Sequence, residues 1–221
     1  MSFPRRVDAV VFDMDGLLLD TEIVYRAAMI EAGNVFGVQF TGEIYASMVG
    51  KTTPESAVML QELFGPKFPV QSYFERVWAD VEDLLAAETK LKAGVVEILD
   101  YLDDQGLPRG IATSNGLAAV ERYLGRFDLL HRFNVVVAHH DVTRHKPHPD
   151  PYLEAARRIG VDPGYCLALE DSHPGVRAAH AAGMMTVMVP DILDPNEEMH
   201  DKCVHIAESL HAVMDLLKAS A

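Results

Sequence analysis

Hydrophobic residues divide the chain into a short strand, a long helical block and a region in which strands and helices alternate. The apolar run at residues 7–12 is typical of a buried strand. Between residues 22 and 89 the apolar positions instead recur at helical spacing. The two clearest sets are Tyr25, Ala28, Met29, Ala32 and Phe36, and then Phe74, Val77, Trp78, Val81 and Leu85. The spacing predicts that residues 22–89 are all-helical.

From about Lys92 the pattern changes to a regular alternation. Helices are predicted at residues 94–105, 116–124, 149–159, 174–182 and about 206–218. Strands are predicted between them, at residues 108–113, 134–138, 166–170 and 185–189. Alternation of this kind is typical of a parallel sheet with helices on both faces. We therefore expect an α/β fold with a doubly wound, Rossmann-like parallel sheet, whose core comprises residues 1–21 and 90–221 and carries residues 22–89 as an inserted helical domain.

Composition and charge limit the classes of partner. The 221 residues include 19 basic and 33 acidic ones, and the formal net charge of −14 argues against a partner that is nucleic acid or an anionic membrane. No apolar run approaches the roughly 18 residues of a membrane span, and no signal peptide is recognised. The only cysteines, Cys166 and Cys203, indicate no disulfide framework. We expect a cytoplasmic protein, monomeric or weakly homodimeric, whose partner is a small molecule.

Two carboxylates one residue apart follow the first predicted strand. Asp13 and Asp15 lie where this strand ends, and Gly16 after them permits a sharp turn. Alternate side chains of a strand share a face, so the two carboxylates start out together at the edge where open α/β sheets bind ligands. Their mutual repulsion requires a cation or a proton. A structural turn remains an alternative for this motif alone, whereas a calcium loop is excluded because Leu17 and Leu18 follow the glycine.

Polar residues also follow two later strands. Thr113, Ser114 and Asn115 lie at the start of a predicted helix, where backbone N–H groups and the helix dipole favour an anion. Simple N-capping of the helix would use the same residues. Lys146 lies in a loop with prolines on either side of it, and taken alone it could be a solvated lysine. Neither segment indicates chemistry by itself.

A second acidic pair, Glu170 and Asp171, follows the strand predicted at residues 166–170. Buried strands seldom end in two adjacent acids without a cation, and oxygen ligands of this kind suit Mg²⁺. The strand ends together supply a carboxylate nucleophile, hydroxyl and amide donors, a lysine and several acids. These are the groups that phosphoryl transfer needs, because a carboxylate can approach a phosphate only when the repulsion between them is screened.

The same segments resemble the sequence motifs of the haloacid dehalogenase-like hydrolase superfamily. The motifs that carry the resemblance are Asp13-Met14-Asp15-Gly16, Thr113-Ser114-Asn115, Lys146-Pro147 and Glu170-Asp171-Ser172. They occur in the family's order, and the resemblance spans nearly the whole chain. The chain is most similar to the branch with a helical cap inserted after the first motif, which includes β-phosphoglucomutase and many small-molecule phosphatases. The resemblance therefore implies a catalytic core with residues 22–89 as an all-helical cap domain.

The resemblance also implies roles for the acidic residues. Asp13 would attack phosphorus and form an aspartyl-phosphate. Asp15 would protonate the leaving alkoxide and then deprotonate the water that hydrolyses the intermediate. Mg²⁺ would be bound by Asp13, by the backbone carbonyl of Asp15 and by Asp171, with Glu170 in contact with the ion or directly behind its ligands.

The remaining motifs would bind the phosphoryl group. Thr113 would hold it, with help from the backbone N–H groups of Ser114 and Asn115 and from the Asn115 side chain, and Lys146 would neutralise its oxygens. The resemblance thus implies a Mg²⁺-dependent phosphomonoester hydrolase acting on a small phosphorylated metabolite such as a sugar phosphate. It argues against dehalogenation, which has no use for this set of metal ligands.

Substrate choice is expected to lie with the cap, because the core motifs bind only the phosphoryl group and the metal ion. Glu22, Gly50 and Lys51 are candidates for substrate binding. Gly50 would permit close approach, and Lys51 would either add positive charge or remain solvated. Tyr25 is a further candidate, although its place on an apolar stripe makes packing the simpler interpretation. A nucleotide-binding P-loop is rejected, because the glycine that this motif requires before Gly50 is absent.

Three alternatives remain to be tested. A phosphomutase of the β-phosphoglucomutase type uses the same core, but that type carries a histidine and an arginine near the positions of Tyr25 and Thr53, so their absence favours hydrolysis. A non-catalytic regulatory or binding protein could retain the fold, although the intact Asp15 argues against it. A zinc site is the third alternative, and its histidines match no recognised zinc spacing. These histidines are His139, His140, His145 and His148.

Overall fold

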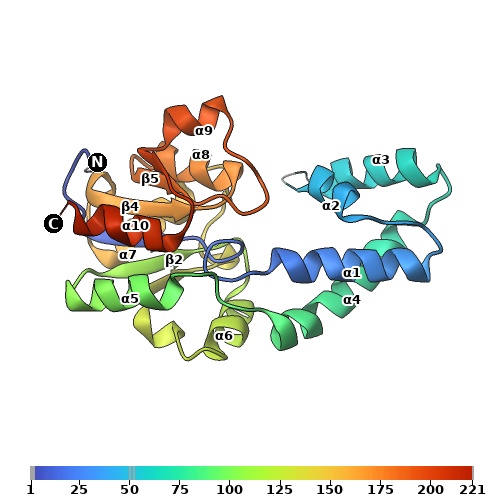
Figure 1. The fold of residues 1–221 in the computed structure, drawn as a ribbon, viewed down its shortest axis with the longest axis horizontal. Coiled ribbons are helices and arrows are strands. Elements are labelled where there is room, and N and C mark those ends of the chain that lie inside the picture. The colour runs from blue at the N-terminus through green and yellow to red at the C-terminus, as the bar shows by residue number, and fades with distance from the viewer. Residues whose placement is uncertain (1–2, 50, 52, 221) are drawn as a thin grey trace. The chain divides into compact units, whose positions relative to one another are not determined.

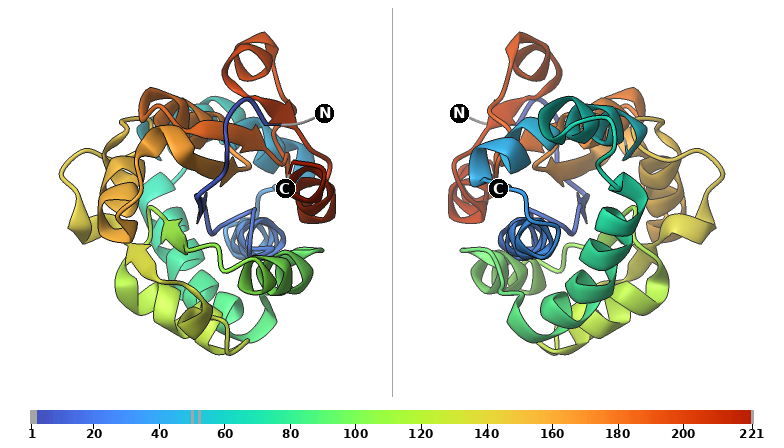
Figure 2. Two further views of the ribbon diagram at one scale, coloured as in Figure 1. Left: turned by 90° about the vertical axis from the view of Figure 1, so that its left-hand side faces the viewer. Right: turned by 90° about the vertical axis from the view of Figure 1, so that its right-hand side faces the viewer.

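The computed structural model describes residues 3–49, 51 and 53–220, which belong to two compact units. The first comprises Met1–Leu19 and Leu91–Ala221, and the second comprises Asp20–Lys90. In Figures 1 and 2 the first unit is a sheet accompanied by helices, and the second consists of the helices coloured from blue to teal. The function of the second unit as a cap stays a prediction.

The first unit is built around a six-stranded parallel sheet (Figure 1). Its strands lie in the order β3-β2-β1-β4-β5-β6, and each neighbouring pair is parallel. The strands are β1 Ala9–Phe12, β2 Arg109–Ala112, β3 Val135–Val137, β4 Cys166–Glu170, β5 Met185–Met188 and β6 His205–Ile206. The strand order reverses beside β1, which lies between β2 and β4. This topology confirms the prediction of a doubly wound α/β fold.

Strand β1 is fully buried because side chains cover both of its faces. On one face, Val11 belongs to an apolar cluster with residues of helices α7 (Asp150–Ile159) and α8 (His173–Ala181). On the other face, the ring of Phe12 meets that of Phe133 edge-on, with 5.9 Å between their centroids. The continuous apolar run at residues 7–12 therefore reflects burial on two sides.

With one exception, the remaining helices of this unit follow the predicted alternation, with small shifts at their ends. They are α5 Val95–Asp104, α6 Leu117–Gly125, α9 Glu197–Lys202 and α10 Leu210–Lys218. Short 3₁₀ turns occupy Leu130–Arg132, His139–Asp141 and Pro163–Tyr165. The sequence did not predict α9 or β6, because each is too short to show a period. Helix α10 begins later than predicted, because the hydroxyl of Ser209 caps it by accepting a hydrogen bond from the backbone of Ala212.

The second unit is helical in its described residues, as the apolar spacing predicted. Its helices are α1 Glu22–Val35, α2 Gly42–Met48, α3 Thr53–Phe64 and α4 Val70–Glu88. Helices α1 and α4 pack along each other. Tyr73 is fully buried between them, and its hydroxyl donates to the backbone carbonyl of Met29 at 2.8 Å. Its ring also lies against Phe36 and Phe40, with centroid separations of 6.0 and 5.9 Å.

Trp78 departs from the predicted apolar stripe of α4. Phe74 and Val77 on that stripe are buried, whereas Trp78 is 54% exposed. The rings of Phe74 and Trp78 stack at 5.6 Å with an interplanar angle of 19°, as residues one helical turn apart can do. Spacing alone could not show this, because the buried stripe comprises Phe74, Val77, Val81 and Leu85 and the indole lies at its margin.

Candidate active site

The register of the sheet brings the predicted motifs to one edge. Phe12 of β1 pairs with Ile111 of β2 on one side and with Leu169 of β4 on the other. The backbone N–H of Asp13 donates to the carbonyl of Leu169 at 3.0 Å, so Asp13 emerges beside Glu170 at the carboxyl ends of the strands. Asp13 is only 7% exposed. A carboxylate in such a position requires a compensating charge.

Two glycines leave room for the second acidic pair. Gly16 has a φ of +78°, and a Cβ atom on it would lie 2.2 Å from Oδ2 of Asp171. Gly175 lies in the first turn of α8, and a Cβ atom there would lie 1.8 Å from Oε1 of Glu170. Any side chain at either position would therefore displace a carboxylate of the pair.

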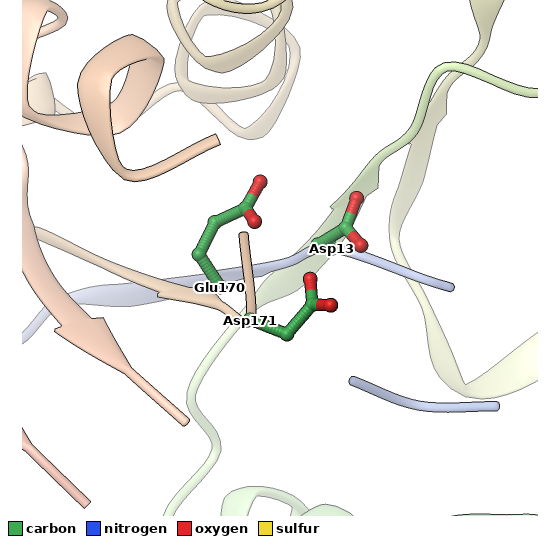
Figure 3. A group of neighbouring side chains, drawn as sticks. All are labelled: Asp13, Glu170 and Asp171. Atoms are coloured by element: carbon green, nitrogen blue, oxygen red, sulfur yellow. The ribbon is translucent and has the colours of Figure 1, made fainter. Parts of the chain in front are cut away.

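Asp13, Glu170 and Asp171 direct their carboxylates toward one another (Figure 3). One oxygen from each lies within 4.8 Å of the others. Among the residues that the structure describes, this is the one group of three or more acidic, histidine or cysteine side chains placed to hold a metal ion. Three carboxylates are ligands for a hard cation, so the donor set fits a divalent ion such as Mg²⁺.

Lys146 reaches this cluster from the loop between β3 and α7. Its Nζ atom lies 2.5 Å from Oδ1 of Asp13 and 2.5 Å from Oε1 of Glu170. The hydroxyl of Tyr152 on α7 donates to the same Oε1 at 2.6 Å, and the hydroxyl of Ser172 donates to Oε2 at 2.9 Å. Burial, and then the Glu170 charge, raise the pKa of Tyr152 well above its usual range, so it remains a donor. Glu170 thus accepts from three side chains and fixes Lys146 beside Asp13.

The site holds more carboxylates than ammonium groups. Burial raises the pKa of Asp13 to about 7; Lys146 opposes this rise, and Glu170 and Asp15 add to it. Burial also raises the pKa of Asp171 well above its usual range, with Asp13 and Glu170 as further causes. Burial lowers the pKa of Lys146, but the two neighbouring carboxylates outweigh it and raise that pKa, so the ammonium stays charged. Additional positive charge would relieve the carboxylates, which supports the fit of a divalent cation.

The carboxylate of Asp15 lies outside this three-residue cluster. The side-chain amide of Asn115 donates to Oδ2 of Asp15 at 2.5 Å, across 100 residues of sequence. The backbone N–H of Asn115 donates in turn to the hydroxyl of Thr113 at 3.1 Å. Thr113 is buried and Ser114 is exposed, and both lie directly before α6. Asn115 therefore orients Asp15, and its expected help in holding a phosphoryl group stays a prediction.

The predicted cap residues make contacts inside the second unit. Glu22 accepts a hydrogen bond from the hydroxyl of Tyr45. Lys51 is exposed, and its Nζ atom donates to the backbone carbonyl of Ser47 at 2.5 Å. Gly50 lies outside the described residues. The role of these residues in substrate binding stays a prediction.

Tyr152 is the site residue that the sequence did not indicate. It follows the Lys146 loop on a helix whose inward positions are otherwise apolar, so it is indistinguishable from a core aromatic by pattern. The one available signal was its hydroxyl group, because a buried tyrosine hydroxyl requires a hydrogen-bond partner.

The four histidines near Lys146 are not arranged as the zinc site that was considered as an alternative. The rings of His139 and His145 stack at 3.9 Å with an interplanar angle of 7°, and His140 meets His139 edge-on. Within the described residues they do not join a group of three metal-ligating side chains. All four lie in the segment between β3 and α7 that also carries Lys146.

Comparison with protein families gives a match over residues 10–189, to the family described as haloacid dehalogenase-like hydrolase. These residues include all the motifs named above. Within the described residues, no helix combines the length and apolarity that crossing a membrane requires.

Several similar proteins have names that state an activity, and two of them illustrate the range. Hexitol phosphatase B of Escherichia coli (strain K12) is 34% identical over 195 residues, which are 86% of this chain and 86% of the relative. A Drosophila melanogaster protein named "Probable pseudouridine-5'-phosphatase" is 37% identical over 193 residues, which are 85% of this chain and 83% of the relative. Both names describe phosphatases, but the phosphate esters in the two names derive from chemically different alcohols.

Among solved structures, a Thermotoga maritima protein provisionally named a beta-phosphoglucomutase is similar over 97% of this chain and 100% of its own. The TM-score is 0.82 and the sequence identity is 28%. The similarity therefore extends over both compact units of the chain.

Proposed function

Because this chain belongs to the haloacid dehalogenase-like hydrolase family, as its motifs indicated, we propose that it is a Mg²⁺-dependent phosphatase of a small phosphomonoester. The observation that carries this proposal is the grouping of Asp13, Lys146 and the acidic pair at the carboxyl ends of β1 and β4. The named relatives are phosphatases, which supports hydrolysis as the reaction. The composition that favours a cytoplasmic protein with a small-molecule partner agrees with this assignment.

We assign Asp13 the role of nucleophile. Its carboxylate would form a bond to phosphorus while the bond from phosphorus to the alcohol oxygen breaks, which gives an aspartyl-phosphate. Lys146 lies 2.5 Å from one Asp13 oxygen and would screen the repulsion between the carboxylate and the phosphoryl group. Water would then attack phosphorus, release orthophosphate and restore the carboxylate.

We assign Asp15 the proton transfers of both steps. It would donate a proton to the leaving alkoxide and later remove one from the attacking water. The hydrogen bond from Asn115 fixes the orientation of its carboxylate. These different roles explain why the two aspartates need different surroundings, with Asp13 inside the acidic cluster and Asp15 outside it.

We assign the metal ion to Asp13, Asp171 and the backbone carbonyl of Asp15. When bound, Mg²⁺ would supply the positive charge that offsets the charge of the phosphoryl group. Glu170 would lie behind these ligands, because both of its oxygens accept hydrogen bonds from side chains. Its role would be to position Lys146.

The phosphoryl oxygens would be bound by the segment that precedes α6. The Thr113 hydroxyl lies at the end of β2, and Ser114 is exposed immediately after it. Backbone N–H groups at the start of α6 would add to this binding, because the helix dipole favours an anion there.

The phosphomutase alternative has one observation in its favour, the similar Thermotoga maritima structure. Tyr25 and Thr53, which stand near the positions of the mutase histidine and arginine, favour hydrolysis. The two reactions have different products. Release of orthophosphate supports the proposal, whereas conversion of a hexose 1-phosphate to its 6-phosphate without orthophosphate would favour the mutase.

The proposal can be tested with purified protein and a panel of phosphate esters, assayed for orthophosphate with Mg²⁺ and with chelator. We expect release that depends on Mg²⁺ and is lost in the Asp13→Asn variant. Absence of orthophosphate release from every ester, in the unaltered protein as in Asp13→Asn, would instead support the non-catalytic alternative.

A further inference from the structure

A further aspartate, Asp191, follows strand β5 and lies beside the acidic pair. Strand β5 runs parallel to β4 with Met188 opposite Glu170, and the backbone N–H of Val189 donates to the carbonyl of Glu170 at 2.7 Å. Because neighbouring parallel strands end at the same edge of a sheet, Asp191 leaves the sheet on the side that carries Asp171. Asp191 belongs to none of the motifs that predicted the site.

Gly16 shows how close Asp191 comes to these motifs. A Cβ atom on Gly16 would lie 2.2 Å from Oδ2 of Asp171 and 3.4 Å from Oδ2 of Asp191. Both distances start from the same point, so the two carboxylate oxygens are neighbours. The residue before Gly16 is Asp15, whose backbone carbonyl is one of the proposed metal ligands. Asp191 therefore lies next to the proposed metal site.

An ion pair holds the other oxygen of Asp191. Nζ of Lys92 lies 2.6 Å from Oδ1, and the two side chains are 26% and 14% exposed. The backbone N–H of Lys92 donates to the carbonyl of Leu18 at 3.0 Å, in the turn that contains Gly16. All of these residues belong to the first unit. The orientation of the Asp191 carboxylate is therefore fixed by the same turn that carries the proposed ligand.

Oδ2 of Asp191 is buried, and no residue that the structure describes donates a hydrogen bond to it. A buried carboxylate oxygen without a donor is costly, so a folded protein normally provides one. Asp191 is not placed as a direct metal ligand, because it does not join Asp13, Glu170 and Asp171 in the described group whose oxygens lie within 4.8 Å of one another. Mg²⁺ usually keeps several water molecules when proteins bind it, and such waters are hydrogen-bond donors.

We propose that Asp191 is a positioning residue for the divalent ion, with Oδ2 accepting a hydrogen bond from a water molecule in the ion's coordination shell. The inference rests on the proposed function and deepens it by adding a residue to the Mg²⁺ site. Acceptors behind the direct ligands orient those ligands, and their loss typically weakens metal binding about 10- to 100-fold. Lys92 keeps Asp191 in place through Oδ1.

The first experiment measures the Kd of Mg²⁺ by isothermal titration calorimetry of the full-length protein without substrate. We expect Asp191→Asn to raise this Kd about 10- to 100-fold. Asp194→Asn is the matched control, because it removes the same charge from the same loop at an exposed position, where solvent screens it. An unchanged Kd in Asp191→Asn, or equal changes in both variants, would overturn the proposal.

The Lys92→Met variant separates the proposed role from simple anchoring of Lys92. It removes the ion pair and leaves the Asp191 carboxylate in the chain. We expect a much smaller rise in the Kd of Mg²⁺ than in Asp191→Asn, because the acceptor for the water remains. Equal rises in the two variants would show that the ion pair alone matters, and would contradict the proposal.

A crystal structure of the unaltered protein with Mg²⁺ provides a test that does not depend on the folding of any variant. We expect a water molecule on the ion whose oxygen lies about 2.5–3.0 Å from Oδ2 of Asp191. Direct coordination of the ion by Asp191 would overturn the proposal. A donor to Oδ2 that does not touch the ion would overturn it as well.

The measurements separate this inference from the proposed function. Binding of Mg²⁺ that depends on Asp191, without orthophosphate release from any ester, would uphold the role of Asp191 and refute the phosphatase. Mg²⁺-dependent release of orthophosphate, with an unchanged Kd of Mg²⁺ in Asp191→Asn, would do the reverse.

Discussion

The Nζ atom of Lys146 lies 2.5 Å from Oδ1 of Asp13, although 133 residues separate them in the sequence. Their side chains are only 8% and 11% exposed, so solvent and salt screen the ion pair weakly. The same ammonium group contacts Glu170, which is fully buried. One lysine therefore forms ion pairs with two carboxylates, and we expect the stability and the activity of the protein to depend on it.

Replacement of Lys146 by methionine should abolish orthophosphate release and destabilise the metal-free protein. The change leaves Asp13 and Glu170 buried without their cation, and breaking a buried ion pair in this way costs about 3–5 kcal/mol. Urea denaturation in the presence of chelator measures the free energy of unfolding. Lys67→Met, at an exposed position, is the control and should change it by less than about 0.5 kcal/mol. Equal stability of the two variants would contradict the described ion pair.

Replacement of Gly175 by alanine should destabilise the protein and reduce its activity. The new methyl group would overlap the Glu170 carboxylate, because a Cβ atom there lies 1.8 Å from Oε1. We expect a loss of about 1–3 kcal/mol, typical of overpacking. Gly125→Ala is the matched control, since nothing lies within 4 Å of its Cβ position and alanine favours a helix. Thermal unfolding should separate the two variants, and a neutral Gly175→Ala would argue against this packing.

Replacement of Tyr152 by phenylalanine should lower stability by about 1–3 kcal/mol, because Glu170 loses a donor that it cannot replace with water. Activity should fall as well, since Glu170 positions Lys146. Tyr165→Phe is the control, because Tyr165 is 45% exposed. Identical unfolding curves for the two variants would show that the Tyr152 hydroxyl does not support the site.

The stability of the metal-free protein should fall as the pH rises between about 4 and 7. The ordinary pKa of an aspartate is near 3.8, and burial raises that of Asp13 to about 7, so in this range the folded state binds more protons than the unfolded state. Mg²⁺ binds the ionised carboxylate, so the rise in melting temperature that Mg²⁺ produces should be larger at high pH than at low pH. Differential scanning fluorimetry with Mg²⁺ and with chelator measures this difference. In Asp13→Asn the pH trend should be weaker, and an unchanged trend would exclude Asp13 as its source.

The sequence was sufficient to predict five strands of the sheet and the residues at its carboxyl edge. A buried parallel strand has a continuous apolar run, and the polar residue that ends it is conspicuous, as at Asp13, Thr113 and Glu170. Because such strands are in register, residues at their ends meet in space. The acidic cluster follows from this rule.

Contacts that depend on side-chain direction could not be predicted. Tyr152 has the pattern of a core residue, and only the fold shows that its hydroxyl reaches Glu170. The bond between Asn115 and Asp15 joins side chains 100 residues apart, and no periodicity describes the directions in which they point. Trp78 fits the apolar stripe of α4 and yet lies at its exposed margin.

The most direct test of the account is to trap the phosphorylated nucleophile. In Asp15→Asn the second step should be blocked because no base activates water, whereas acetyl phosphate, whose leaving group needs no proton, should still react with Asp13. We predict that intact-mass measurement and peptide mapping after incubation with Mg²⁺ find one phosphoryl group per chain, on the peptide that contains Asp13. The label should be absent with chelator and in the Asp13→Asn, Asp15→Asn double variant. A label on another residue, or orthophosphate release that persists in Asp13→Asn, would contradict the account.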